Sequence, residues 1–517
     1  MNNLNIPQCC PNGGTGLKNP VGVTRRDFLK TMGGSTLSVV ALSGIAWPLL
    51  SGLSLEENPG IIRRPLVVKP LLIYDTPEYQ YQTSWRSWGG IHSQHAAAEE
   101  IARITNELEK LRTQADFPVI FLPVSGIRNT SELNSIGDLA SSDTIIVYAA
   151  GGWMDIFDLL NKMNKDMILF CRHKSGPVYL WYEIISPRYL RQHTDKLAVA
   201  GVDEEDVIID SQDEILWRLR ALCGLHNTLN TKIIAIGGAG AWAQPEGVVP
   251  ALIEDKFRFR IYSYSYDDLG NLIKDVKADR AAVKRAEKRA GEYLNGNSIT
   301  LETKREFVDN AFLLEDVFRR IMDKENCRSI TINGCMGTIM PLAETSACLT
   351  LSLLNDSGYP SFCESDFVVV PAGVLLANIS GKPSFLNDPT YPHDGIITLA
   401  HCTAPRRMDG INTEPARILT HFESDYGAAP KVEMKLGQTV TNIIPDFLVS
   451  HYVGLKGSIT DNPFMDICRS QIDISFNCNS NILARRMPGF HWITGYGDYI
   501  RETGYALKRM GIDFEVL

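Results

Sequence analysis

Short apolar runs separated by helix-like periods make up the first part of the chain. Residues 95–114 repeat apolar side chains at helical spacing, with Ile101, Ile104, Leu108 and Leu111 on one face. The runs that predict strands are residues 65–74, 119–124, 143–149 and 166–171. Strands that alternate with helices are typical of a parallel sheet with crossover helices, so we expect an α/β domain over residues 60–230.

A second α/β pattern follows and predicts a domain over residues 231–395. It opens with a buried-strand run at 232–236 that ends in four small residues, Gly237 to Gly240. Its further predicted elements are helices at about 271–294 and 301–325, a strand at 328–332 and a helix at 347–355. Together the two units predict a pair of Rossmann-like domains, each built on a parallel sheet.

From about residue 396 the pattern changes to short strand-like pieces separated by Gly-containing turns. These pieces are residues 396–401, 416–421, 429–435 and 439–445, and a helix over 499–510 closes the chain. Such a pattern indicates an all-β domain over 396–517, either a barrel or a sandwich.

Composition and charge narrow the class of protein. The chain has 517 residues, 44% of them hydrophobic and 21% charged, as in ordinary folded enzymes. Its formal net charge of −9 argues against a nucleic-acid binder, which needs a basic surface to displace counterions from phosphates.

Residues 1–55 resemble an export signal rather than part of the fold. Residues 24–30 carry a twin-arginine pattern, Thr-Arg-Arg-Asp-Phe-Leu-Lys, and an uncharged, Gly- and Ser-rich stretch follows to about residue 53. An ordinary transmembrane helix is the alternative, but Gly33, Gly34, Gly44 and Pro48 make that stretch a poor span. We therefore expect export by the Tat translocase to the periplasm, with an uncleaved membrane anchor still open because no clean cleavage site is present.

The eleven cysteines do not form a disulfide framework. Their number is odd, and Cys171, Cys223 and Cys348 lie inside apolar runs, where a free thiol behaves as a small buried hydrophobe. Folding in the cytoplasm before Tat export is consistent with free thiols.

Three separated motifs in the last third carry the candidate chemistry. They contain Glu364 and Asp366, then His401, then His491 followed by Trp492. Two carboxylates and two imidazoles suffice to hold one divalent metal ion in an open octahedral site if the fold brings them together. Spacing by two on an extended segment would point both carboxylates to one face. Taken alone, the pair Glu364 and Asp366 could equally cap a helix, each histidine could be a core residue, and Trp492 could fill the core.

Two further segments have alternative interpretations. Arg86 and Trp88 follow the first strand and suit recognition of a polyol, or they cover a seam between helix and sheet. The segment Gly238-x-Gly240-x-x-Ala243 fits a dinucleotide-binding loop, but a proline at 245 interrupts any helix, so a tight turn is favoured.

Four motifs in order resemble the L-fucose isomerase and L-arabinose isomerase superfamily. They are the helix and turn at 348–360 leading into Cys-Glu-Ser-Asp at 363–366, His-Cys at 401–402, His-Phe at 421–422 with Lys-Leu-Gly at 435–437, and Gly-Phe-His-Trp at 489–492 with Tyr-Gly-Asp at 496–498. The resemblance implies two α/β domains and a C-terminal barrel. It also implies a trimer or hexamer, Mn²⁺, and aldose–ketose isomerisation through a cis-enediol.

The resemblance also assigns roles to residues. Asp366 matches the second acidic ligand, His491 the C-terminal histidine, and Glu364 lies in the same motif. The first acidic ligand of the family lies some two dozen residues before the second, where this chain offers Glu344. Asp366, Glu364 and Glu344 are thus the expected catalytic carboxylates and, with His491, the metal ligands.

Trp88, Arg86, His401 and Trp492 are the expected substrate contacts, the first two across a subunit interface. The favoured function is a metal-dependent sugar isomerase. The alternatives are a sugar-binding protein without activity on the same scaffold and an NAD(P)-dependent sugar oxidoreductase that uses the Gly238 loop.

Overall fold

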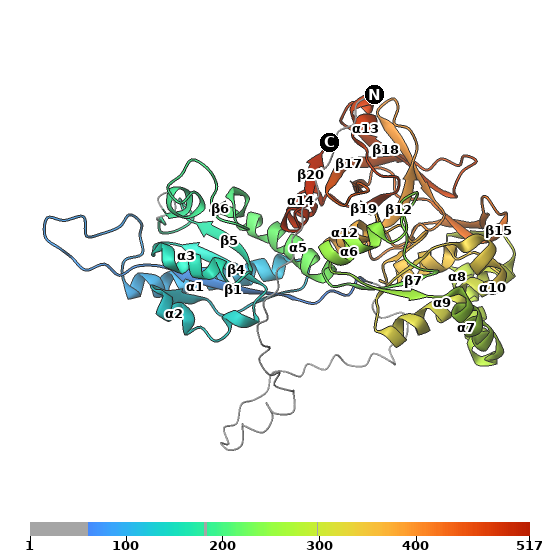
Figure 1. Cartoon of the computed structure of the whole chain (residues 1–517), viewed down its shortest axis with the longest axis horizontal. Helices are drawn as coiled ribbons and strands as arrows, with labels where there is room; N and C mark the ends of the chain where they lie inside the picture. The colour runs from blue at the N-terminus through green and yellow to red at the C-terminus, as the bar shows by residue number, and fades with distance from the viewer. Residues whose placement is uncertain (1–59, 180–183, 297) are drawn as a thin grey trace, which may run out of the picture. The chain divides into compact units, whose positions relative to one another are not determined.

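The computed structural model describes residues 60–179, 184–296 and 298–517 (Figure 1). The predicted Tat segment therefore lies outside the described residues. Within those residues no single helix is long and apolar enough to cross a membrane. Only the pair Cys335–Ala343 and Cys348–Asp356, bent by 81° at the break between them, reaches that length and composition.

A parallel sheet, here called sheet A, forms the first α/β unit, as predicted (Figure 1). Its strand order is β2-β1-β4-β5-β6, and β3 also pairs with β1. The strands are β1 (Leu66–Ile73), β2 (Val119–Phe121), β3 (Ser125–Ile127), β4 (Thr144–Ala149), β5 (Asp166–Cys171) and β6 (Val207–Ile209). Every pairing in it is parallel, which the strand–helix alternation in the sequence predicts.

Alternate side chains of β1 enter two separate apolar cores. Leu66, Val68 and Leu72 pack with helices α1 (Gln94–Gln114) and α5 (Gln212–Thr228). Leu71 and Ile73 pack on the other face, in the core that contains α2 (Thr130–Asn134) and α3 (Met154–Asn161). The sheet is thus covered on both faces, as a parallel sheet requires.

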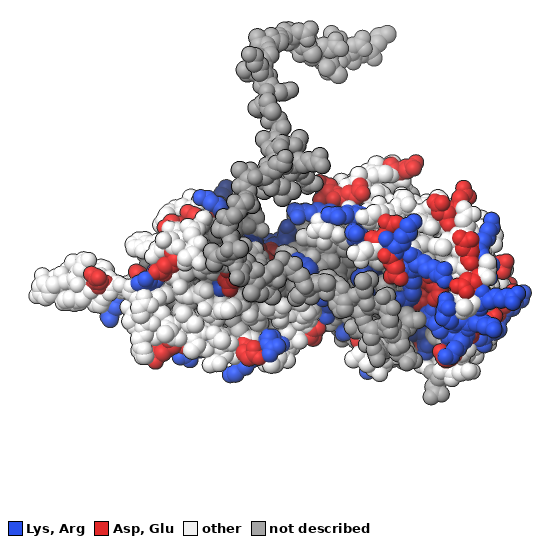
Figure 2. Space-filling model, turned by 90° about the horizontal axis from the view of Figure 1, so that it is seen from below, with Lys and Arg blue, Asp and Glu red and all other residues white. Residues whose placement is uncertain are grey.

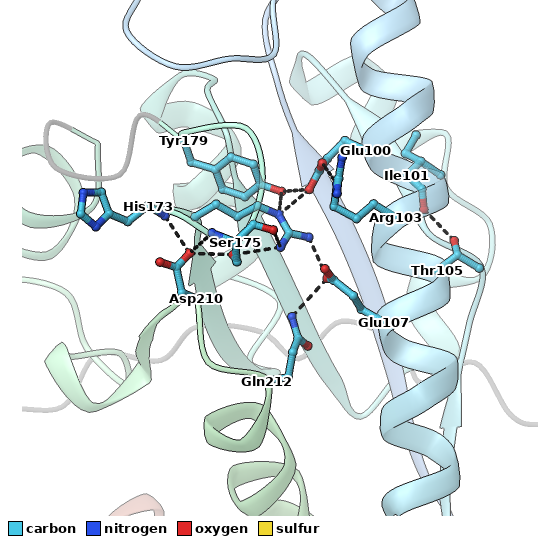
Figure 3. Close-up of polar contacts among 11 residues, drawn as sticks. Glu100, Ile101, Arg103, Thr105, Glu107, His173, Ser175, Tyr179, Asp210 and Gln212 are labelled. Atoms are coloured by element: carbon cyan, nitrogen blue, oxygen red, sulfur yellow. Dashed lines mark hydrogen bonds and ion pairs between the residues drawn. The ribbon is translucent and has the colours of Figure 1, made fainter.

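A buried ion network fastens α1 to the end of β5 (Figure 3). Arg172, just after β5, is fully buried and contacts Glu100 on α1 at 2.5 Å and Glu107 at 2.7 Å. Tyr179 donates its hydroxyl to Glu100 at 2.6 Å. Because each buried charge has an opposite charge and hydrogen bonds, the cost of removing it from water is offset.

A second parallel sheet, sheet B, has the order β11-β10-β7-β8. Its strands are β7 (Lys232–Ile236), β8 (Arg260–Tyr264), β10 (Ser329–Ile332) and β11 (Ser361–Phe362). The accompanying helices are α6 (Val248–Lys256), α7 (Tyr266–Ala278), α8 (Arg280–Asn295), α9 (Arg305–Glu325), α10 (Met340–Ala343), α11 (Cys348–Asp356) and α12 (Val370–Ser380). All its strand pairings are parallel, so the second predicted α/β unit is confirmed.

The prediction of one helix over 271–294 is wrong, because Asp279 divides that segment into α7 and α8. Asp279 has an extended ψ of 96° and accepts the N–H groups of Ala281 and Ala282, so it caps the second helix. Figure 2 shows that Lys and Arg side chains gather toward one end of the face it presents, with Asp and Glu side chains among them. Arg289 of α8 pairs with Glu315 and Asp316.

The C-terminal part contains a closed six-stranded antiparallel barrel. Its order is β16-β19-β12-β13-β18-β17, closed by the pairing of β17 with β16. The strands are β12 (Phe385–Pro389), β13 (Ile396–His401), β16 (Thr439–Ile444), β17 (His451–Asp461), β18 (Ser470–Phe476) and β19 (Trp492–Tyr496). Of the two predicted alternatives, barrel and sandwich, the structure has the barrel.

Two of the predicted strand pieces lie outside the barrel. Strands β14 (Ala416–His421) and β15 (Tyr426–Val432) form a three-stranded sheet with β9 (Ile299–Leu301) from the preceding unit. Strand β20 (Asp513–Val516) pairs parallel with β17, and the closing helix is α14 (Ile500–Arg509). The barrel also includes β12, which precedes the change of pattern at residue 396.

The network around Arg172 gives a stability prediction. Arg172→Ala leaves Glu100 buried without its main partner, and we expect a loss of about 3–5 kcal/mol in unfolding free energy. The matched control is Arg103→Ala, because Arg103 contacts the same Glu100 at 3.1 Å but its side chain is 47% exposed, and it should cost under about 1 kcal/mol. Urea denaturation followed by circular dichroism measures both, and equal losses would contradict this account of the network.

Candidate metal centre

The register of three neighbouring barrel strands brings three possible ligands together. Asn387 of β12 pairs with Trp492 of β19, so Asp388 lies opposite His491. Asp388 also pairs with Ala400 of β13, next to His401 at the end of that strand. Antiparallel pairing thus places one carboxylate between two imidazoles that are 90 residues apart in the sequence.

The loop after β11 supplies a second group of carboxylates, and it is a turn rather than the extended segment predicted. Glu364 and Ser365 both have positive φ, 66° and 43°, a region that non-glycine residues seldom occupy. The turn is fixed because Gly240 donates its N–H to the Ser365 carbonyl at 3.2 Å and accepts the N–H of Phe367 at 3.0 Å. The loop after β7 therefore determines where the carboxylates of the loop after β11 lie.

Asp366 is buried, and both of its carboxylate oxygens contact donors of other residues of the chain. Its Oδ1 accepts the N–H groups of Trp242 at 3.2 Å and Val368 at 3.1 Å. Its Oδ2 lies 2.7 Å from Nδ1 of His491, which is also fully buried. This bond places the proton on Nδ1 and leaves Nε2 facing the other carboxylates.

Glu364, Asp388 and the two histidines converge around one point. The Nε2 atom of His491 lies 3.2 Å from Asp388 Oδ1 and 3.3 Å from Glu364 Oε2. The other oxygen of Glu364, Oε1, lies 3.6 Å from Nε2 of His401. On its far side, Nδ1 of His401 contacts the Thr403 hydroxyl at 3.2 Å.

The charges of this cluster shift one another's pKa values. The contacts of Glu364 with His401 and His491 lower the pKa of Glu364, while burial raises the pKa of Asp388. Burial opposes a charge on His491, but its contacts with Asp366, Glu364 and Asp388 outweigh burial and raise its pKa to about 10. The cluster therefore favours a positive charge at its centre.

The donor set fits a metal ion at that position. Three ligand atoms, Asp388 Oδ1, His401 Nε2 and His491 Nε2, are buried and have no hydrogen-bond partner among the described residues. These residues form a group whose ligand atoms all lie within 4.8 Å of one another. Neighbouring ligands about 2.1 Å from an octahedral ion lie roughly 3 Å apart, close to the 3.2 and 3.3 Å that separate Nε2 of His491 from Asp388 and Glu364. The buried group of Asp388, His401 and His491 can thus hold a metal ion.

A cavity of about 810 Å³ opens over this cluster. Glu364, Asp388 and His401 line it, together with the loops that follow β7, β10 and β11 at the carboxyl ends of sheet B. Ligands of open α/β sheets bind at this edge, and the volume suits a small molecule. Trp242 and Phe490 also line it, with their rings stacked 3.9 Å apart.

Several residues singled out in the sequence lie elsewhere. Glu344 ends α10 at the surface, where its side chain is 59% exposed and pairs with Lys277 at 3.1 Å. Arg86 and the 74% exposed Trp88 contribute to no wall of the cavity, and Trp492 is fully buried in the apolar core that includes the barrel strands. Of the predicted set the structure brings together Glu364, Asp366, His401 and His491.

The residue that sequence reasoning missed is Asp388. Its surroundings, Asn-Asp-Pro at the end of β12, are typical of a turn and gave no local sign of a strand. A signal was nevertheless present, since Asp388 follows Glu364 by 24 residues, the separation expected between two acidic ligands.

The glycine loop after β7 lies on the cavity wall and leads into a turn. Helix α6 begins only at Val248, with Gly247 as its N-cap, so no helix N-terminus follows Gly240 directly. Gly237 has a φ of 77°, and a side chain there would begin 2.1 Å from the hydroxyl of Tyr266. Gly240 has a structural role, because its backbone hydrogen bonds hold the turn that carries Asp366.

No family model matches the chain, and no curated protein matches it either. The chemistry assigned to the cavity therefore rests on its own residues and distances. The resemblance to sugar isomerases remains one of short motifs in a shared order.

The position of Asp366 behind His491 predicts a graded effect of its substitution. Asp366→Asn keeps the shape but weakens the hold on the Nδ1 proton, so we expect metal affinity to fall about 10–100-fold. Isothermal titration calorimetry with Mn²⁺ measures this affinity. Asp446→Asn is the control, since Asp446 accepts backbone N–H groups of Ser450 and His451 away from the cavity, and an equal loss there would sink the assigned role.

Proposed function

We propose that this chain is a metal-dependent sugar isomerase, interconverting an aldose and a ketose through a cis-enediol. The observation that carries the proposal is a set of three buried ligand atoms without a hydrogen-bond partner among the described residues, from Asp388, His401 and His491, beside Glu364 at a cavity of small-molecule size. A proton or a cation must lie between these groups, because facing lone pairs repel. A divalent ion satisfies all of them at once.

The proposed ligands are Glu364, Asp388, His401 and His491, and the proposed ion is Mn²⁺. Oxygen and imidazole ligands with open positions suit Mn²⁺ better than a thiophilic ion. The motif resemblance supports the same set, since two acids some two dozen residues apart and a C-terminal histidine are its expected ligands. Asp388 is here the acidic ligand that the sequence alone assigned to Glu344. Asp366 is not a ligand in this proposal and orients the ring of His491 through Nδ1.

When bound, such an ion polarises the oxygens of a neighbouring carbonyl and hydroxyl and lowers the cost of an enediolate. Glu364 and Asp388 are the two carboxylates of the cluster that line the cavity, so either can remove the proton from one substrate carbon and return it to the next. Asp366 cannot share this task, because both of its oxygens already accept hydrogen bonds.

The cavity also offers a surface for the carbon skeleton of a sugar. The stacked pair Trp242 and Phe490 presents a ring face on the wall, and C–H groups of a pyranose pack well on indole. Glu246 and Gln244 on the same wall supply acceptors and donors for hydroxyl groups. We extend the proposal to a trimer or hexamer in which the exposed Trp88 and Arg86 reach a neighbouring subunit's site, and to export through the Tat translocase.

Asp388 is the sharpest test of the metal ligands. Asp388→Asn should reduce Mn²⁺ affinity by at least about 100-fold, because an amide is a neutral and poor ligand for a hard cation. The control Asp473→Asn changes the same side chain on β18, where it accepts the Thr398 hydroxyl at 2.6 Å. Equilibrium dialysis with metal analysis measures both, and full occupancy in the Asp388 variant would overturn the ligand set.

Turnover needs its own assay. Mn²⁺-loaded protein incubated with a panel of aldoses should form the matching ketose, and reaction in D₂O should place deuterium on the carbon next to the new carbonyl. Glu364→Gln and Asp388→Asn should each abolish conversion. A sugar that binds and stays unconverted would favour the sugar-binding alternative, and hydride transfer to NAD(P) would favour the oxidoreductase.

A further inference from the structure

Thiols are concentrated around the same cavity. Five cysteines line it, and all nine that the structure describes are free: the cavity-lining ones are Cys335, Cys348, Cys363, Cys402 and Cys468. The proposed Mn²⁺ site is built from carboxylate oxygens and imidazole nitrogens, and none of these thiols is among its ligands. A soft ligand beside a hard-ion site calls for an explanation of its own.

Cys363 is the thiol with the best-placed neighbours. Its Sγ, a carboxylate oxygen of Glu364 and a ring nitrogen of His401 all lie within 4.8 Å of one another. Nε2 of His401 is buried and has no hydrogen-bond partner among the described residues. An imidazole nitrogen without a hydrogen-bond partner, a carboxylate and a thiol at this separation match the donor types that tetrahedral Zn²⁺ sites use.

The two oxygens of Glu364 separate this group from the Mn²⁺ group. Oε2 faces His491 at 3.3 Å, whereas Oε1 faces His401 at 3.6 Å. Asp388 and His491 belong to the first group alone, and Cys363 belongs to the second group alone. His401 belongs to both groups, and Glu364, which also contacts His491, is a proposed ligand of the Mn²⁺ ion as well.

We propose that Cys363, Glu364 and His401 form a second cation position, specific for a thiophilic divalent ion such as Zn²⁺ or Cd²⁺. Binding converts the Cys363 thiol to a thiolate, and its proton passes to solvent. The cavity gives the ion access and leaves the fourth coordination position to water. Because Glu364 and His401 cannot serve both ions fully, a thiophilic ion at this position weakens binding of the hard ion.

The other thiols fit this position less well. Cys402 packs with Cys348 and Cys468, and its Sγ accepts the N–H of Arg469 at 3.4 Å. No nitrogen or carboxylate ligand completes a group around these three sulfurs within 4.8 Å, among the residues described. They therefore provide matched controls rather than the proposed site.

The test uses Cd²⁺ as the probe on the full chain, because a cadmium–thiolate bond gives a charge-transfer absorption in the ultraviolet. The wild-type protein should develop this band on titration, and Cys363→Ser should lose it. Cys468→Ser, which changes a thiol on the same cavity wall, should keep it. Circular dichroism of each variant confirms that it is folded.

Two further variants make the result independent of the proposed function. Asp388→Asn should lose Mn²⁺ binding and keep the cadmium band, whereas Cys363→Ser should do the reverse. The competition rests on the proposed Mn²⁺ centre, and it predicts that Cd²⁺ displaces Mn²⁺ from the wild type but not from Cys363→Ser. A band that persists in Cys363→Ser and disappears in Cys468→Ser would overturn the proposal in favour of the Cys402 cluster. A protein that shows no band would overturn it as well.

Discussion

The hydrogen bond between Asp366 and His491 joins the two halves of the cavity. One partner comes from the loop after the edge strand of sheet B and the other from the rim of the barrel, and both side chains are almost completely buried. Such a bond between ionisable groups is strong where water is excluded, and it costs several kcal/mol to break by removing one partner. The bond fixes the ring of His491, whose Nε2 contacts Glu364 and Asp388.

Backbone constraints on both sides support that bond. The turn at Glu364 and Ser365 is held in an unfavourable left-handed conformation by its bridge to Gly240. Across the cavity, the antiparallel register of β19, β12 and β13 places His491, Asp388 and His401 side by side. The loop and the barrel together hold the four side chains of the proposed site near one point.

The sequence was informative where the signal is local. The buried runs of β1, β4, β5 and β7 are short, continuous and bounded by turns, so their apolar pattern alone predicts them. His401 stood out because it ends a predicted strand, and His491 because an aromatic residue, Trp492, follows it. Asp366 stood out too, but its role behind His491 depends on burial, which no local pattern encodes.

Asp388 shows what the sequence could not supply. Strand β12 has only five residues and ends in Asn-Asp-Pro, and it is a strand because two distant segments pair with it. Long-range pairing also separates β14 and β15 from the barrel, although their local pattern equals that of the barrel strands. The prediction of Glu344 as a ligand was wrong for a related reason. The spacing of some two dozen residues was counted back from Asp366, whereas the two carboxylates of the cluster that line the cavity are Glu364 and, 24 residues later, Asp388.

The proposed site has one divalent ion among Glu364, Asp388, His401 and His491. X-ray diffraction from crystals grown with Mn²⁺, collected at the manganese absorption edge, would locate such an ion. We expect one strong anomalous peak bonded to His491 Nε2 and Asp388 Oδ1, with Asp366 still hydrogen-bonded to Nδ1 of the same ring. A fully ordered cavity without a peak, or a peak bound to other residues, would contradict the proposed site.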